Sequence, residues 1–594
     1  MSAPRASAHQ GSQLIQRLTG IARRPVVLQG ALLAALLLTF LLSVSQVRAY
    51  TGAIQRDSFT LQGEIPAPVL RYTPPADSRL PVVAVIAHGY AASKEIMSSF
   101  AVDLAKQGIT VYTFDFPGHG ASTAFYGGPA HNGSGVVAQL VSTLGEVVDY
   151  ATAHAPPQAK LVLLGYSLGT IAVGDYALQH PNMANLQATV LVAGILQDKP
   201  TLTNPRNLLV LTGQFDLPGI NDIARNAIAA ACATPASIVR GSSYQCEVNA
   251  ADWRKRVILP GLDHISIVTA ASTHDVVIQW LGQTVDSRIG QTPVNADNRL
   301  HWMLVGFLAA LLAIVPLVKL LSLAFRLRPA PDGPDEAVEA TDGVELVAGE
   351  PQTELTEEQE APTPGLPRLL GFGALIGSLA LGLVALRLAL PSSFWGPDPF
   401  PFTFLRQQVS ADVAIFFLFA GALLTATIWG VRRFRARVTL PPWREALPQG
   451  LIAAIVTAFL TLTLGSLSTY AWESLALEPQ RLWRGAVYAV MVWPFFFGLR
   501  SLLRAMGPRL KHPVLADLGA SLLVVAALVG AIMMNFGRLS YLGILLPIVA
   551  ILLLLFAGIS AVARHTLWHP VALISVLEAF LLAWVLSATL PLVA

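Results

Sequence analysis

The chain has 594 residues, enough for roughly three or four soluble domains, but its composition argues against an ordinary soluble protein. Hydrophobic residues make up 54% of the chain and charged residues only 13%, about half the usual share, and the mean hydropathy is +0.56. The same figures exclude a disordered chain, and a net charge of +3 gives no sign of a nucleic-acid-binding protein. Two cysteines are too few for a zinc ribbon or an iron–sulfur cluster.

The first apolar run covers residues 27–47 and follows a segment whose charged residues are all arginines. The run has about 20 residues, enough to cross a membrane and longer than the apolar core of most cleaved signal peptides. We therefore predict a cytoplasmic N-terminus over 1–26 and an uncleaved transmembrane signal anchor over 27–47. The small-x-small pattern of residues 47–49 leaves a cleaved signal peptide open as the alternative.

Residues 48–300 are predicted to form a soluble domain of alternating strands and helices. The unbroken apolar run 82–87 predicts a strand buried on both faces, and 109–114 and 160–164 are further predicted strands. Helical patterns lie between them, over 100–107 and 136–154. Strands that alternate with helices indicate a parallel sheet with covering helices, so the predicted fold class of this domain is α/β.

The motif Gly165-Tyr166-Ser167-Leu168-Gly169 directly follows the predicted strand 160–164 and precedes a helical pattern. Strand, sharp turn and helix are the context in which a G-x-S-x-G motif presents a nucleophilic serine. The two glycines allow the strand and the helix to approach closely, and the start of the helix offers backbone N–H groups to a developing oxyanion. We predict that Ser167 is a catalytic nucleophile. The alternative is an ordinary serine in a glycine-rich turn.

A serine nucleophile needs a general base and an acid that orients the base. Two later predicted strands are each followed by a short turn with a titratable residue, Asp216 in the first and His264 in the second. Because α/β sheets build sites at the carboxyl ends of their strands, we predict that His264 is the base and Asp216 the acid. Asp115 and Asp263 compete for the acid role and are interpreted as residues that orient loops.

An oxyanion hole needs two N–H donors. The first is predicted to be the backbone of Leu168, the residue after the nucleophile. The second is predicted in the loop after the strand 82–87, at Tyr90.

Three motifs together resemble the α/β-hydrolase superfamily: His88-Gly89-Tyr90, Asp115-x-Pro-Gly-His-Gly120 and the motif around Ser167. They look most like the branch of monoacylglycerol lipases, small esterases and serine aminopeptidases. The resemblance covers about residues 60–285. It implies an eight-stranded sheet, a Ser-His-Asp triad and no metal or organic cofactor.

The chain departs from that branch where its members usually carry a lid. Ser167 and Asp216 are only 49 positions apart, which leaves no room for a lid domain between them, so we expect the fold without a large lid. An extra segment lies instead at 219–253 and contains both cysteines. Because this segment is predicted to face an oxidising compartment, we predict a disulfide between Cys232 and Cys246, with two buried thiols as the alternative.

From residue 301 the chain consists mostly of apolar blocks of about 20 residues, each long enough to cross a membrane. We predict spans at 302–325, 368–390, 410–431, 448–470, 484–503, 514–535, 540–562 and 570–592. These blocks form a predicted all-α polytopic membrane domain of about eight spans, and the N-terminal anchor adds a ninth. The segment 326–367 is predicted to be an acidic cytoplasmic linker, since residues 329–367 carry eleven acidic residues and no lysine or arginine.

Basic residues in short loops favour the cytoplasmic side of a membrane. With the N-terminus inside, basic clusters near 319–328, 432–444 and 500–511 also fall inside, while the opposite loops hold few basic residues. We therefore predict a multi-pass protein of the plasma membrane or an equivalent membrane, with residues 48–300 and the C-terminus extracytoplasmic. Glu578 lies within the last predicted span, where it has a functional role, takes part in a helix–helix contact or lies shallow enough to reach water.

The sequence favours a membrane-anchored extracytoplasmic serine hydrolase that cleaves carboxylic esters, of lipids or other acyl compounds, through an acyl-enzyme. The expected partners are the lipid bilayer and a lipid or acyl-ester substrate, without nucleic acid. The membrane surface, the membrane domain and segment 219–253 are expected to replace the missing lid. The alternatives are a serine peptidase or amidase of the same fold, an open-site esterase for soluble substrates, a transporter or lipid-handling protein with an accessory hydrolase domain, and a binding module on an inactive hydrolase fold.

Overall fold

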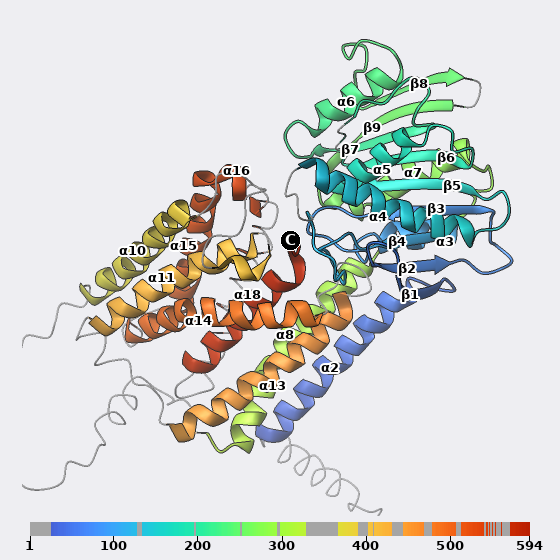
Figure 1. The fold of residues 1–594 in the computed structure, drawn as a ribbon. Helices are drawn as coiled ribbons and strands as arrows, with labels where there is room; N and C mark the ends of the chain where they lie inside the picture. Colours follow the sequence, from blue (N-terminus) through green and yellow to red (C-terminus); the bar gives the residue numbers. More distant parts are fainter. Residues whose placement is uncertain are drawn as a thin grey trace, which may run out of the picture.

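The computed structural model contains an α/β domain and a separate group of long helices (Figure 1). It describes residues 25–127, 133–194, 196, 198–249, 252–293, 297–327, 366–389, 402–407, 409–430, 443–468, 478–506, 513–539 and 571–593, with isolated positions between 542 and 560. The predicted cytoplasmic N-terminus, nearly all of the acidic linker and most of the span predicted over 540–562 lie outside the described residues.

The α/β domain is built on one nine-stranded sheet with the order β1-β2-β4-β3-β5-β6-β7-β9-β8. The strands are β1 (Gln55–Leu61), β2 (Ala67–Thr73), β3 (Val82–Ala87), β4 (Thr110–Phe114), β5 (Lys160–Tyr166), β6 (Leu186–Val192), β7 (Leu208–Phe215), β8 (Ser243–Asn249) and β9 (Asp252–Asp263). The six strands from β4 to β9 in this order run parallel, and the antiparallel pairs lie toward the two edges. This confirms the predicted α/β class.

The sheet has one strand more than the eight that the family resemblance implies. The additional strand is β8, which belongs to the 219–253 segment and pairs antiparallel with β9 at the edge of the sheet. Its exposed polar residues alternate with the half-buried Tyr244, Cys246 and Val248, which is a strand pattern that the prediction did not use.

Helices cover both faces of the sheet: α3 (Ser98–Lys106), α4 (Gly133–Ala153), α5 (Leu168–Gln179), α6 (Ile220–Ala231) and α7 (Ala271–Thr284). A short 3₁₀ turn, η1 (Ser266–Val268), precedes α7. Strand β3 is buried along its whole length, because Val82, Ala84 and Ile86 enter one core while the residues between them enter the other. This explains why β3 is an unbroken apolar run.

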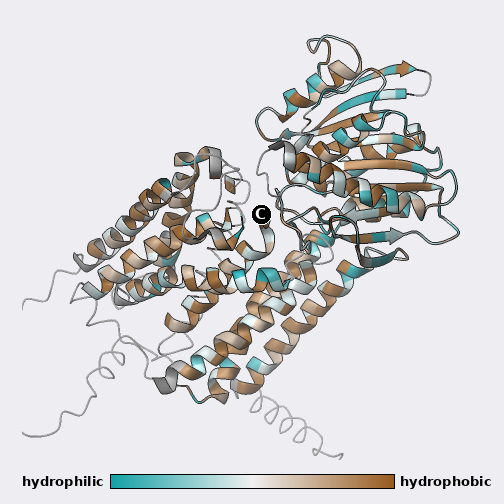
Figure 2. Cartoon of the chain, viewed as in Figure 1, coloured by the Kyte–Doolittle hydropathy of each residue, from teal (hydrophilic) through white to brown (hydrophobic). Residues whose placement is uncertain are grey.

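The helical part comprises α2 (Pro25–Ala49), α8 (Arg299–Ala324), α10 (Leu366–Ala389), α11 (Ser410–Gly430), α13 (Trp443–Ser468), α14 (Pro479–Met506), α15 (Pro513–Met534), α16 (Phe536–Leu539) and α18 (Val571–Thr589), with a 3₁₀ turn η2 (Phe402–Leu405). Eight of these described helices, all but α16, are long and apolar enough to cross a membrane. Apolar residues run along their whole lengths (Figure 2), and many of them are exposed, as lipid-facing residues would be. We call this part the membrane domain.

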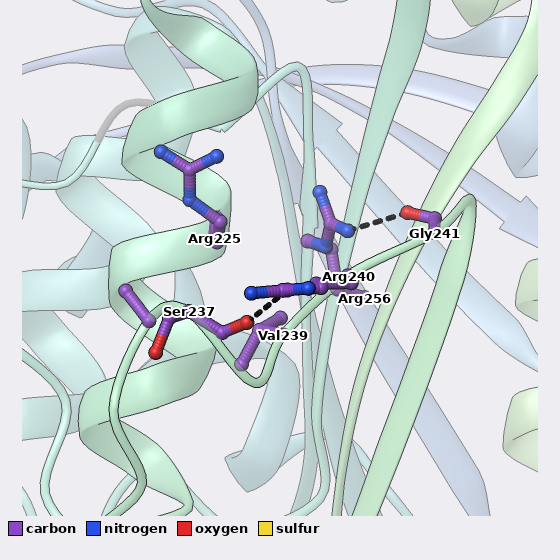
Figure 3. Close-up of a pocket in the computed structure, with 7 residues that line it drawn as sticks. Arg225, Ser237, Val239, Arg240, Gly241 and Arg256 are labelled. Carbon is purple, nitrogen blue, oxygen red and sulfur yellow. Dashed lines mark hydrogen bonds between the residues drawn. The ribbon is translucent and has the colours of Figure 1, made fainter.

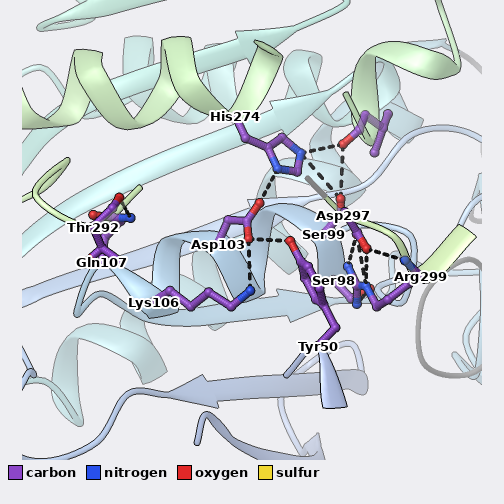
Figure 4. Close-up of polar contacts among 11 residues, drawn as sticks. Tyr50, Ser98, Ser99, Asp103, Lys106, Gln107, His274, Thr292, Asp297 and Arg299 are labelled. Carbon is purple, nitrogen blue, oxygen red and sulfur yellow. Dashed lines mark hydrogen bonds and ion pairs between the residues drawn. The ribbon is translucent and has the colours of Figure 1, made fainter. Parts of the chain in front are cut away.

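Both chain connections between the two parts dock on α3 (Figure 4). Tyr50, just after α2, donates a 2.6 Å hydrogen bond from its hydroxyl to Asp103, and Arg299, at the start of α8, donates to Ser98 Oγ at 3.2 Å. Lys106 Nζ and the Arg299 guanidinium lie 3.6 and 4.5 Å from the centre of the Tyr50 ring. These contacts fix the α/β domain to the first helices of the membrane domain.

Candidate active site

Ser167 occupies the sharp turn between β5 and α5. Its φ of 50° and ψ of −115° are rarely adopted by a residue other than glycine. The turn is closely packed on both sides: a Cβ atom at Gly165 would lie 2.5 Å from the Gly169 carbonyl oxygen, and one at Gly169 would lie 2.4 Å from that of Ala87. The two glycines of the motif are therefore required by this packing.

The structure brings the three residues of the predicted triad together. His264 Nε2 lies 2.9 Å from Ser167 Oγ, and His264 Nδ1 lies 2.5 Å from Asp216 Oδ1. The Asp216 side chain is fully buried, and Ser167 and His264 are only 8% and 7% exposed. With Nδ1–H donating to the carboxylate, the lone pair of Nε2 is free to accept the serine proton. The arrangement can therefore generate a nucleophile.

The Asp216 carboxylate is itself held in place by backbone donors. The Gly213 N–H donates to Oδ2 at 3.2 Å and the Leu217 N–H to Oδ1 at 2.8 Å. The two competing carboxylates have other partners. Asp115 binds the Lys94 ammonium group at 2.5 Å, and Asp263 accepts the hydroxyl of Ser266 at 2.7 Å.

The predicted oxyanion donors adjoin the nucleophile. We call residues 88–91, which follow β3, the oxyanion loop. A Cβ atom at Gly89 would lie 3.2 Å from Ser167 Cβ, so this loop packs directly on the serine. Leu168 is the first residue of α5, and the first four N–H groups of a helix have no partner within the helix. The roles of Tyr90 and Leu168 remain predictions.

His88 joins the oxyanion loop to the loop after β4. Its Nε2 accepts the Phe116 N–H at 3.0 Å, and its Nδ1 lies 2.7 Å from the Gly89 carbonyl oxygen, to which it must donate. The ring is completely buried, and this burial lowers the pKa of His88 to about 4. The folded protein therefore requires a neutral His88 with its proton on Nδ1.

We expect this neutral histidine to make the stability of the protein fall with pH below about 6.5. An unfolded histidine titrates near 6.5, while the pKa of folded His88 is about 4. The unfolded state thus binds more protons between these values, and the free energy of unfolding decreases as the pH falls through this window. Melting curves of the wild type and of His88→Gln from pH 7 to 4.5 test this, and the variant should show the smaller pH dependence. Equal pH dependence would contradict the assignment.

We call the region in which both chain connections contact α3 the junction (Figure 4). A second Asp–His–Ser group, formed by Asp103, His274 and Ser99, lies in this junction. His274 Nδ1 is 2.6 Å from Asp103, but its Nε2 is 2.8 Å from the carbonyl oxygen of Val268 and 3.5 Å from Ser99 Oγ. A carbonyl oxygen only accepts hydrogen bonds, so Nε2 must carry a proton and cannot remove one from Ser99. We interpret this group as structural.

The 219–253 segment lies beyond the acid and forms α6 and β8. The predicted disulfide joins Cys232, at the end of α6, to Cys246 in β8. The connection between β6 and β7 spans only residues 193–207, and its described residues form no helix or strand. The described part of the domain therefore has no lid inserted between the nucleophile and the acid.

The membrane domain covers the side of the site on which the oxyanion loop lies. Ala91 is buried in the core of the membrane domain, and Tyr90 packs against that core and against the core of the α/β domain. Val593, near the end of the chain, packs against the α/β core as well. The sequence predicted a role of the membrane domain in covering the site, but no local motif indicated the contacts of Ala91 and Val593.

Glu578 takes part in a buried ion-pair cluster within the membrane domain. The Arg500 guanidinium donates to both carboxylate oxygens of Glu578, to Asp517 at 2.7 Å and to Ser560 at 3.0 Å. The cluster joins α14, α15 and α18, so the helix–helix contact is the alternative that these contacts favour.

Comparisons with known proteins find similarity to hydrolases. Residues 81–219 match the family Hydrolase_4, described as serine aminopeptidase, S33. The pimeloyl-acyl-carrier-protein methyl ester esterase of Proteus mirabilis is 30% identical over 109 residues, which are 18% of this chain. The match spans only 35% of the length of that curated relative.

Solved structures of hydrolases also match. A CIB-like hydrolase from Thermoplasma acidophilum aligns with 39% of this chain and 98% of its own, at 16% identity and a TM-score of 0.29. A dienelactone hydrolase from Anabaena variabilis aligns with 39% of this chain and 97% of its own, at 16% identity and a TM-score of 0.28.

Proposed function

We propose that this chain, whose α/β domain is an α/β-hydrolase, is a membrane-bound serine hydrolase that cleaves carboxylic esters of lipids or other acyl compounds. The observation that carries the proposal is His264, with Nε2 2.9 Å from Ser167 and Nδ1 2.5 Å from the buried carboxylate of Asp216. A serine, a base and an orienting acid in this geometry are what acyl transfer requires.

In this mechanism Ser167 Oγ attacks the ester carbonyl carbon while its proton passes to His264 Nε2. Asp216 stabilises the resulting imidazolium, and the N–H groups of Tyr90 and Leu168 bind the oxyanion of the tetrahedral intermediate. The intermediate collapses to the acyl-enzyme, and His264 gives its proton to the departing alkoxide. Water, activated by His264, then releases the acid and restores Ser167.

The surroundings of the site support a lipid as the substrate. An ester with a long acyl chain must reach the serine without crossing bulk water, which related enzymes achieve with a lid. Here the oxyanion loop packs against the core of the membrane domain, and both chain connections fix the α/β domain beside the candidate spans. We propose that the membrane domain takes over the role of the lid and that the ester comes from the bilayer.

A serine peptidase is the second candidate, because the matched family is described as a serine aminopeptidase and the triad serves amides equally well. The deciding experiment uses the full-length protein in nanodiscs. A fluorophosphonate probe should label the wild type and leave Ser167→Ala unlabelled. A panel of short soluble esters, long-chain glycerolipids in the disc and aminoacyl amides should then show the highest kcat/KM for the lipid esters. Faster cleavage of the amides would favour the peptidase, and an unlabelled wild type would exclude both.

The proposal includes an extracytoplasmic catalytic domain. A topology reporter inserted near Pro200 and one fused after Ala594 should both be active outside the cytoplasm, while one near Val338 should be active inside. The two outside positions should agree, since the end of the chain lies against the α/β domain. A cytoplasmic signal near Pro200 would contradict the orientation.

A further inference from the structure

Arg481, at the start of α14, joins the membrane domain to a loop beside the candidate active site. Its guanidinium donates to Gly118 O at 2.7 Å and to Gly120 O at 3.0 Å in the α/β domain. It also donates to Ser587 O and Leu590 O, both at 2.8 Å, at the end of α18. Arg481 is only 1% exposed, so its charge is buried and is solvated by these four carbonyl groups.

The end of the chain contacts the same loop. We call residues 115–120 the docking loop and residues 590–593 the C-terminal tail. The Leu592 N–H donates to Gly118 O at 2.8 Å, and the Tyr126 N–H donates to Leu592 O at 2.8 Å. Gly118 has a φ of 74°, and a Cβ atom there would lie 2.3 Å from the Leu592 carbonyl oxygen. Tail and loop therefore fit together only with glycine at this position.

The docking loop in turn holds the oxyanion loop. Asp115 accepts the Lys94 N–H at 2.7 Å, and the Phe116 N–H donates to His88 Nε2 at 3.0 Å. Lys94 and His88 flank Tyr90, the predicted oxyanion donor. Two steps of hydrogen bonding thus connect Arg481 to the backbone that would stabilise the oxyanion.

We propose that Arg481 and the C-terminal tail are positioning elements of the active site, through which the membrane domain holds the oxyanion loop in its reactive geometry. This inference rests on the proposed hydrolase function. It gives the membrane domain a part in catalysis besides anchoring. Losing Arg481 removes one donor from each of four carbonyl groups and breaks the direct link from α14 to Gly118 and Gly120, which loosens the docking loop. A displacement of about 1 Å at a catalytic group can cost about 100-fold in rate.

The test compares three variants: Arg481→Gln, a chain that ends after Thr589, and the control Arg484→Gln. Each variant keeps the α/β domain and all spans and is reconstituted in nanodiscs. Arg484, one turn along α14, donates to Leu405 O and Gln480 O within the membrane domain. Rates on a short soluble ester are divided by the fraction of protein that a fluorophosphonate labels at saturation, which removes the contribution of misfolded molecules. We expect kcat per labelled site to fall about 10- to 100-fold in the first two variants. KM should change less than about threefold, and Arg484→Gln should resemble the wild type.

Wild-type kcat per labelled site in both Arg481→Gln and the shortened chain would overturn the inference. If Arg481→Gln does not fold, the shortened chain decides alone. The outcome is separate from that of the proposed function, which Ser167→Ala tests in the same assay: an inactive Ser167→Ala with fully active Arg481→Gln rejects only the positioning role.

A second and independent observation concerns a basic pocket in the 219–253 segment (Figure 3). The pocket has a volume of about 530 Å³ and is lined by Arg225, Arg240 and Arg256, with no acidic side chain among its lining residues. Arg256 is 3% exposed, and among the described residues its guanidinium donates a hydrogen bond only to Gly241 O, at 2.7 Å. Among the described residues no acceptor contacts its Nε atom.

No carboxylate among the residues that line the pocket balances the positive charge of Arg256. Arginine stays charged at all physiological pH values, and a buried guanidinium without a counter-charge is costly. Arg240 offers no compensation, since it is a second cation that donates to Ser237 O at 2.5 Å. Arg225 pairs with Asp222 at 2.8 Å on the exposed side of α6. The disulfide joins the end of α6, the helix of Arg225, to β8, which pairs with β9, the strand of Arg256.

The geometry points to a binding site for an oxyanion, such as a phosphate group, between Arg240 and Arg256. The group could be free phosphate or part of an acidic lipid headgroup. Thermal melting of the full-length protein in phosphatidylcholine nanodiscs, with phosphate titrated against chloride at constant ionic strength, tests the free anion. The same melting in phosphatidylglycerol nanodiscs without phosphate tests the headgroup.

We expect a saturable rise in Tm of several degrees in one of these two arms. Arg256→Gln should abolish this rise in Tm, and so should Arg240→Gln, which replaces an exposed residue. The control Arg288→Gln removes a surface arginine paired with Asp286 and should retain the rise. Comparing the change in Tm, rather than Tm itself, keeps the test valid if a variant is less stable. The absence of a shift in both arms, or an equal shift in wild type and Arg240→Gln, would overturn the site.

Discussion

Replacing Ser167 by alanine should abolish ester hydrolysis, with a loss of about 10⁴-fold or more in kcat. Ser167 Oγ lies 2.9 Å from His264 Nε2 and is the atom that would form the acyl-enzyme. Alanine has no oxygen at this position. His264→Ala should cost about as much, since the serine then has no base. Asp216→Asn should cost about 10³- to 10⁴-fold, because the amide can hold the imidazole in the wrong tautomer.

The junction provides a matched control for these variants. Ser99 also lies near a histidine that contacts an aspartate, but at 3.5 Å from a nitrogen that already faces a carbonyl oxygen. Ser99→Ala should therefore keep its rate within about threefold of the wild type, while its fluorophosphonate labelling remains complete. Initial rates on a chromogenic ester, normalised to folded protein by gel filtration, measure all four variants. Substantial activity in Ser167→Ala would remove the basis of the proposed function.

Gly169→Ala should lower activity about 100-fold or more, although it adds only one methyl group. The new Cβ atom would lie 2.4 Å from the Ala87 carbonyl oxygen and 2.7 Å from that of His88, which are both backbone atoms at the base of the oxyanion loop. The strand or the helix must then shift, and the shift displaces Ser167 from His264. Overpacking of this kind costs about 1–3 kcal/mol of stability.

Gly174→Ala, five positions along α5, is the control. A Cβ atom there would meet only the end of the Leu196 side chain, at 2.6 Å, and that side chain can rotate away. Its activity should stay near that of the wild type, and alanine is the better helix former. Rates per fluorophosphonate-labelled site and melting curves of both variants test the pair. Similar activities in the two variants would show that the close approach at Gly169 does not matter for catalysis.

Local patterns in the sequence were sufficient to predict the central sheet and the members of the candidate site. Strand β3 is apolar throughout because both of its faces are buried, and Ser167, Asp216 and His264 each follow a strand within a few residues. A reactive residue a few positions after an apolar strand pattern is a short-range signal, and it can be recognised in a single sequence. The predicted disulfide could be inferred for the same reason, since both cysteines lie in one short segment.

Features that depend on distant contacts could not be predicted. Strand β8 is a different case, because Tyr244, Cys246 and Val248 alternate with polar residues, which is a local strand signal that the prediction overlooked. Arg481 binds Gly118, 363 positions away, and nothing in the sequence around either residue indicates the other. The predicted spans 448–470 and 484–503 leave Arg481 in a loop on the predicted extracytoplasmic side, where residues 48–300 are also predicted to lie, which agrees with this contact. Glu578 was recognised as costly to bury, but its partner Arg500 was predicted to be a cytoplasmic loop charge.

The α/β domain is attached to the membrane domain at two separated places, at Tyr50 and Arg299 on α3 and at the docking loop through Arg481. A body fixed at two places cannot swing on a tether, so Ser167 keeps a constant height above the spans. For the proposed lipid substrate, every encounter then takes place by two-dimensional diffusion. The reaction rate should follow the mole fraction of the ester among the lipids of the bilayer, and diluting the vesicles in buffer should leave the turnover per enzyme unchanged.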